Sequence, residues 1–187
     1  MRSIIWVIML PVFLHDGEGI AGGFLSGVLH PLTGPDHLVA MVAVGLWGAF
    51  LGAPAIWVLP VVFPLVMAAG AILGLAEIAI PAVETGIAVS AIALGLMVAF
   101  AAKPPLPFAA ALVGIFAIFH GHAHGTELPA SADALSYSLG FVLSTGALHL
   151  AGVGLGFAVE KPGGRKFVRA CGVVIAAVGV GFLTGVL

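Results

Sequence analysis

The sequence contains very few charged residues. Only 7% of its 187 residues are Asp, Glu, Lys or Arg, whereas 61% are hydrophobic and the mean hydropathy is +1.25. Soluble domains carry about 25% charged residues, because a surface in water has to be solvated. Most of the outer surface of this chain must therefore face a lipid bilayer.

The sequence also has little positive charge and little cysteine, and each of these further limits what kind of protein it can be. The formal net charge is −2, so the basic surface of a nucleic-acid-binding protein is missing. The single cysteine, Cys171, cannot form an internal disulfide and is interpreted as a small apolar residue of the last apolar segment. The apolar runs are continuous rather than alternating, which favours transmembrane helices over a transmembrane β-barrel.

Eight apolar stretches follow one another, and the breaks between them carry Pro, Gly and the few charges. They cover residues 4–14, 20–29, 38–51, 56–75, 86–102, 107–119, 134–159 and 168–187. The pattern predicts an all-α, polytopic membrane helix bundle of six to seven membrane helices. Because a span needs about 20 residues, a short or re-entrant helix is expected near residues 18–30.

The N-terminus and the loop charges predict the topology. Residues 1–14 have the basic start and apolar core of a signal peptide, and they are interpreted as that or as an N-terminal apolar segment. Residues 15–187 then form one transmembrane domain, in which His15 is a further candidate ligand. Lysine and arginine gather in two loops, around 103 and 161–169, which should be cytoplasmic. We therefore expect a multi-pass protein of a bacterial inner membrane.

The first polar cluster is the segment 30–37, HPLTGPDH. Its prolines break the helix, so His30, Asp36 and His37 can converge as they could not on a straight helix. Two imidazoles and a carboxylate suit a borderline divalent metal ion. A purely structural alternative is that Thr33 caps the next helix, with Asp36 in a capping box.

The second cluster is the segment 119–127, FHGHAHGTE, at the outward end of a helix. His120 and His124 share one helical face, whereas His122 is turned away by about 160°. We expect the first two to join the metal site, and His122 and Glu127 to serve its entrance. A solvated, histidine-rich helix end is the alternative.

A lone histidine, His149, lies near the middle of the stretch 134–159. It is either an additional ligand or gate, or a histidine that hydrogen-bonds a neighbouring helix. Intramembrane ionisable residues are costly, and this cost favours a functional role.

These segments resemble a known family. The segment 30–47, HPLTGPDHLVAMVAVGLW, resembles the signature of the HupE/UreJ proteins, a group of nickel permeases. The segments 119–127 and 140–149 are similar to that family's second and third motifs. The resemblance implies transport of nickel, with cobalt second, into the cytoplasm for hydrogenase or urease maturation. It also implies that His30, Asp36 and His37 are essential to transport.

Two other classes remain open from the sequence. An intramembrane zinc-dependent hydrolase would use a His₃/Asp site, which Asp36 with His30, His37 and His120 could form. No His-Glu-x-x-His helix is present, so a non-enzymatic transporter is preferred. A metal sensor or chaperone that moves no ion is the third class. Without a Walker A motif, transport must follow a gradient, couple to another ion, or use partners in an oligomer or an accessory subunit.

Overall fold

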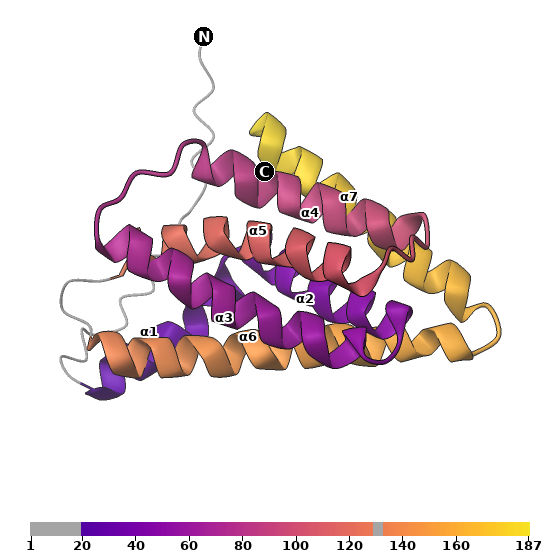
Figure 1. Cartoon of the computed structure of the whole chain (residues 1–187), viewed down its shortest axis with the longest axis horizontal. Coiled ribbons are helices and arrows are strands. Elements are labelled where there is room, and N and C mark those ends of the chain that lie inside the picture. Colours follow the sequence, from indigo (N-terminus) through magenta and orange to yellow (C-terminus); the bar gives the residue numbers. More distant parts are fainter. Residues whose placement is uncertain (1–19, 129–132) are drawn as a thin grey trace, which may run out of the picture.

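The computed structural model describes residues 20–128 and 133–187, and within these ranges the chain is entirely helical (Figure 1). The helices are α1 (Ile20–Thr33), α2 (Pro35–Leu51), α3 (Ala55–Leu75), α4 (Val83–Ala99), α5 (Leu106–Thr126), α6 (Ala134–Gly156), the 3-10 helix η1 (Phe157–Glu160) and α7 (Gly164–Thr184). The predicted all-α helix bundle is confirmed. The segment 1–14 and His15 lie outside the described residues.

Within these ranges, four helices are long and apolar enough to cross a membrane: α3, α5, α6 together with η1, and α7. A fifth span results if α1 and α2, which meet at 80°, form one broken span, and α4 is a shorter apolar helix. Large apolar side chains such as Trp57, Leu65 and Leu150 point outward and are exposed. Such a surface suits lipid rather than water, so the chain is a multi-pass membrane protein.

A sharp bend at Gly34 separates α1 from α2. Thr33 ends α1, and its hydroxyl donates back to the carbonyl oxygens of Leu29 (3.2 Å) and His30 (3.1 Å). Gly34 is extended, and Pro35 opens α2 at the position where its missing N–H costs least. The alternative that Thr33 caps α2 is therefore wrong. At about 21 Å, α1 is shorter than the roughly 30 Å hydrocarbon core, as expected of a short or re-entrant helix.

Helices α3 and α5 pack with their backbones in contact. Gly70 and Gly74 on α3 face α5, and Gly121 and Gly125 on α5 face α3. A Cβ atom at any of these positions would overlap a carbonyl oxygen of the opposite helix. The four-residue spacing on both helices is the small-xxx-small pattern of membrane helix pairs. This contact fixes the height of α5, and with it the histidine motif, relative to α3.

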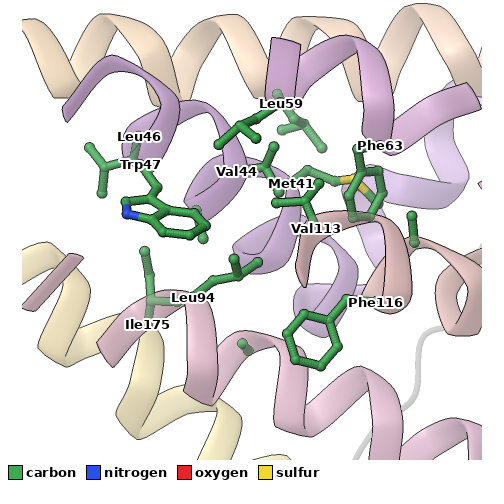
Figure 2. Close-up of a cluster of buried hydrophobic side chains, with 14 of the residues drawn as sticks. Met41, Val44, Leu46, Trp47, Leu59, Phe63, Leu94, Val113, Phe116 and Ile175 are labelled. Carbon is green, nitrogen blue, oxygen red and sulfur yellow. The ribbon is translucent and has the colours of Figure 1, made fainter. Parts of the chain in front are cut away.

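Helix α2 is the centre of the bundle and contacts α1, α3, α4, α6 and α7. Its buried side chains Met41 and Val44 lie beside Leu59 and Phe63 of α3, whereas Trp47 lies on the side of Leu94 of α4 (Figure 2). The indole Nε1 of Trp47 donates to a backbone carbonyl oxygen at 3.2 Å, which satisfies its one polar atom. A ligand carried by α2 therefore lies inside the bundle and not on its lipid-facing surface.

The charged residues separate toward the two ends of the bundle. At one end, the guanidinium Nε of Arg169 donates to the carbonyl oxygen of Ala99 (2.7 Å), so α7 begins beside the connection that carries Lys103. At the other end, Oδ1 of Asp133 accepts from the backbone N–H of Ser136 (2.8 Å) and caps α6. This hydrogen bond holds the pKa of Asp133 below its usual range. The two basic loops thus share an end, as the topology prediction requires.

Candidate metal centre

The two histidine motifs, far apart in sequence, meet where α1, α2 and α5 converge. His30 lies in the last turn of α1, His37 in the first turn of α2, and His120 and His124 on one face of α5. The ring centroids of His37 lie 6.2, 5.0 and 4.5 Å from those of His30, His120 and His124, and His30 lies 4.9 Å from His124. We call these four residues the histidine cluster.

Two carboxylates flank the histidine cluster. Nδ1 of His37 lies 2.9 Å from Oδ1 of Asp36, and Nε2 of His30 lies 3.4 Å from Oε2 of Glu127. One potential ligand atom each from His30, His124 and Glu127 lies within 4.8 Å of the others. One ion could bind these three after small movements of the side chains. Negative charge beside the imidazoles would favour a cation there.

Three of the four residues of the histidine cluster are buried, and several of their ring nitrogens are unpaired. His120 is 0% exposed, His124 5% and His37 7%. Among the described residues, neither nitrogen of His124, nor Nε2 of His37, nor Nδ1 of His120 has a hydrogen-bond partner, whereas Nδ1 of His37 has Asp36 beside it. Each unpaired buried polar group costs about 1–3 kcal/mol, so the arrangement is expensive as a purely structural feature. Lone pairs gathered in this way are what a metal ion requires.

Ser90 on α4 fixes the tautomer of His120. Its Oγ lies 2.6 Å from the carbonyl oxygen of Ile87 and 2.9 Å from Nε2 of His120. The carbonyl can only accept, so the one hydroxyl proton goes there, and the contact with His120 needs an Nε2–H donor. The hydrogen-bond network therefore assigns the proton to Nε2. Nδ1 of His120 is left with a lone pair that is available to a metal ion.

Aromatic side chains wall the histidine cluster on the sides of α3 and α6. The ring centroid of Phe141 lies 4.2 Å from that of His124, Tyr137 lies 6.0 Å from His30, and Phe63 lies 5.5 Å from His120. The site predicted from the sequence did not include these residues or Ser90. The sequence does carry one signal, because Ser90 is the only polar side chain in the apolar stretch 86–102.

His122 lies apart from the histidine cluster. Its Nε2 lies 2.8 Å from the carbonyl oxygen of Ile78, which can only accept, so the ring donates there. With Glu77 and Thr126 it lines a cavity of about 330 Å³ between the ends of α3 and α5. The sequence pattern predicts His122 and Glu127 together at an entrance, whereas the structure places Glu127 beside His30. Two residues along a helix turn a side chain by about 200°, which separates His122 from its neighbours.

His149 also lies outside the histidine cluster. It is 1% exposed on α6, and its ring centroid lies 5.5 Å from that of Phe63. The structure thus brings together His30, Asp36, His37, His120, His124 and Glu127, and it leaves His122 and His149 at two separate places. The remaining candidate, His15, lies in the part of the chain that is not described.

Comparisons with known proteins cover nearly the whole chain. Residues 4–182 match the model of a family described as HupE / UreJ protein. The chain is 45% identical over 179 residues to Protein HupE of Rhizobium leguminosarum bv. viciae, which covers 95% of this chain and 94% of that protein. No solved structure gives a significant match. The matched range includes every member of the histidine cluster.

Proposed function

Because the chain belongs to the HupE/UreJ family, we propose that it carries a divalent transition-metal ion, nickel first and cobalt second, across the bilayer into the cytoplasm. The observation that carries this proposal is the buried histidine cluster with its unpaired ring nitrogens and two flanking carboxylates. Imidazole suits nickel, cobalt and zinc, whereas magnesium and calcium prefer a set of oxygen ligands. The donor set therefore favours a transition metal over the more abundant hard cations.

The charge distribution supports an inward direction of transport. Short loops rich in lysine and arginine stay in the cytoplasm, and Lys103 and Arg169 lie at one end of the bundle. The end that carries Glu127 and His30 then faces outward, where the half-exposed carboxylate of Glu127 can attract cations. From there the ion would pass to His124, His37 and His120. In a bacterium, this orientation corresponds to uptake through the inner membrane.

The extended arrangement of ligands supports transport over hydrolysis. A catalytic zinc ion is held by three ligands around one centre, with donor atoms about 3.3 Å apart, and water takes the fourth position. Here the ligands continue beyond the one group of three, His30, His124 and Glu127. The rings form a row, in which His30 contacts His124, His124 contacts His37, and His37 contacts His120. An ion in such a row can exchange one ligand at a time. This property suits passage rather than a fixed metal that activates water.

The proposal is tested with purified protein in proteoliposomes. Nickel uptake is measured with a metal-sensitive dye inside the vesicles, in competition with cobalt, zinc, manganese and magnesium. We expect saturable nickel uptake that cobalt inhibits and that magnesium leaves unchanged. Tight nickel binding without uptake would instead favour a sensor or chaperone. Bound zinc, together with hydrolysis of a membrane peptide, would favour the enzymatic alternative.

Replacing Ser90 by alanine should weaken nickel binding about 10- to 100-fold, the usual effect of losing a residue that orients a metal ligand. Without the hydroxyl, Nε2–H of His120 loses its acceptor, and the ring is free to move its proton to Nδ1. Ser90→Thr keeps a hydroxyl and should restore most of the affinity. Calorimetry measures the affinity, and ¹⁵N NMR of the histidine ring reports the tautomer. Unchanged affinity and tautomer in Ser90→Ala would contradict the assigned role.

His122 and His124 form a matched pair, because both are buried histidines on α5. His124→Ala removes a ring that contacts His30 and His37, so nickel uptake should be lost at every concentration. His122→Ala leaves the histidine cluster intact and changes the cavity shared with Glu77, where ions would collect, so excess nickel should restore uptake. The measurement is initial uptake rate against nickel concentration for both variants. Reversed behaviour would mean that the ion follows the other face of α5.

A further inference from the structure

A second polar position lies deeper in the bundle, around His149. This residue follows Phe141, which contacts the histidine cluster, by eight residues on α6, or about 12 Å along the helix toward the basic end. The ring of Phe63 contacts both regions, with its centroid 5.5 Å from those of His120 and His149. Phe63 is itself fully buried. An apolar ring thus connects the histidine cluster to a histidine further along the same bundle.

The ring of His149 can form more hydrogen bonds than its surroundings provide. It is 1% exposed, and neither of its nitrogens has a hydrogen-bond partner in the described part of the chain. One turn earlier on the same face of α6, Thr145 is 0% exposed, and its hydroxyl likewise has no partner within residues 20–128 and 133–187. Two such groups side by side in a lipid-embedded bundle would be costly without a ligand.

Helix α3 supplies an oxygen at the same place. Pro64 has no N–H, so the carbonyl oxygen of Pro60 loses the helical hydrogen bond that it would otherwise accept. This carbonyl oxygen lies near the imidazole of His149, although the two do not complete a hydrogen bond in the structure. Pro60 and His149 both line a cavity of about 390 Å³ between α3 and α6. If the imidazole donates one N–H to the carbonyl, its second nitrogen still offers a lone pair.

We propose that His149, with the Pro60 carbonyl and the Thr145 hydroxyl, forms an inner binding site that receives the divalent ion from the histidine cluster, past Phe63, before release to the cytoplasm. This inference rests on the proposed transport function. One imidazole and two neutral oxygens bind a borderline ion more weakly than four imidazoles with two carboxylates. A site from which an ion must leave has to bind weakly enough to release it.

The close approach of α2 holds this site together. A Cβ atom on Gly45 would overlap the backbone carbonyl oxygen of His149, so only glycine lets α2 lie directly against α6 here. Val44, which directly precedes Gly45, and Met41, one turn earlier, are fully buried beside Phe63 in the apolar core (Figure 2). The inner site is therefore separated from the histidine cluster by packed apolar side chains rather than by open water.

Equilibrium dialysis of the full-length protein against nickel ions alone tests the inner site. The wild type should bind two ions per chain, one tightly and one more weakly. His149→Gln keeps an amide that can donate to Pro60 but is a poor metal ligand, and it should bind only the tighter ion, with its affinity unchanged within about twofold. His37→Ala should show the reverse, losing the tighter ion and keeping the weaker one. In proteoliposomes, His149→Gln should lower the maximal uptake rate at least tenfold with little change in half-saturating nickel.

Two results would overturn the inference in different ways. A wild-type protein that binds one ion, lost in His37→Ala and kept in His149→Gln with normal uptake, would remove the inner site and leave the proposed transport intact. A wild type that neither binds nor takes up nickel would overturn the proposed function itself.

Should His149→Gln fail to fold, Thr145→Val keeps the side-chain shape and removes the hydroxyl. This variant should weaken only the second ion, and unchanged binding would again count against the inner site.

Discussion

Replacing His37 by alanine is expected to abolish nickel uptake and to weaken nickel binding at the histidine cluster by more than about 100-fold. His37 is the central residue, because its ring contacts those of His30, His120 and His124 and its Nδ1 approaches Asp36. Losing an orienting residue already costs about 10- to 100-fold in metal affinity, and losing a ligand should cost more. The remaining rings would also face a cavity at the point where the row is broken.

The control for His37→Ala is His122→Ala, which also removes a buried imidazole but lies outside the row. Membrane insertion and the thermal midpoint in detergent show whether either variant is folded. Asp36→Asn extends the test, because it keeps the size of the side chain and removes its charge; it should lower uptake while the protein stays folded. Normal nickel uptake by a folded His37→Ala protein would contradict the proposed role of the histidine cluster.

The sequence predicted the helices well because their ends carry chemical signals. Proline and glycine mark the breaks, as at Gly34 and Pro35, and the apolar stretches between them have the length of helices. The common face of His120 and His124 follows from helical periodicity alone. These features depend on residues that are close in sequence, so local reasoning could identify them.

The partners of those residues could not be predicted in the same way. In a soluble helix, the apolar face shows which side is buried, but a membrane helix is apolar on all sides and gives no such direction. Periodicity therefore placed His122 opposite His124 without showing that it bonds Ile78. The pairing of Glu127 with His30 and of Ser90 with His120 depends on how α1, α4 and α5 pack. Close glycine contacts between helices distant in sequence contribute to that packing, as where Gly27 of α1 meets α6 and Gly121 of α5 meets α3.

Substitution of one of those glycines should be as damaging to the protein as substitution of a metal ligand. Gly121→Ala is expected to destabilise the folded protein by about 3 kcal/mol or more, at or beyond the upper end of overpacking effects. The new Cβ would overlap the carbonyl oxygen of Met67 and lie 2.9 Å from the backbone nitrogen of Ala71. Backbone atoms of α3 cannot rotate away as a side chain can, so α5 must shift. His120, one residue earlier, would shift with it, and nickel affinity should fall together with stability.

Gly114→Ala provides the matched control for this prediction. Gly114 lies on α5, seven residues before Gly121, and also faces α3, but its nearest neighbours there are the side chains of Val66 (3.7 Å) and Val62 (3.9 Å). A methyl group fits at these distances, and replacing a helical glycine by alanine gains roughly 0.5–1 kcal/mol. Thermal unfolding in detergent, with and without nickel, should therefore show a lowered midpoint for Gly121→Ala and an unchanged or raised one for Gly114→Ala. Equal midpoints would mean that α3 and α5 are not held in backbone contact, and that the height of the second histidine motif is set by other helices.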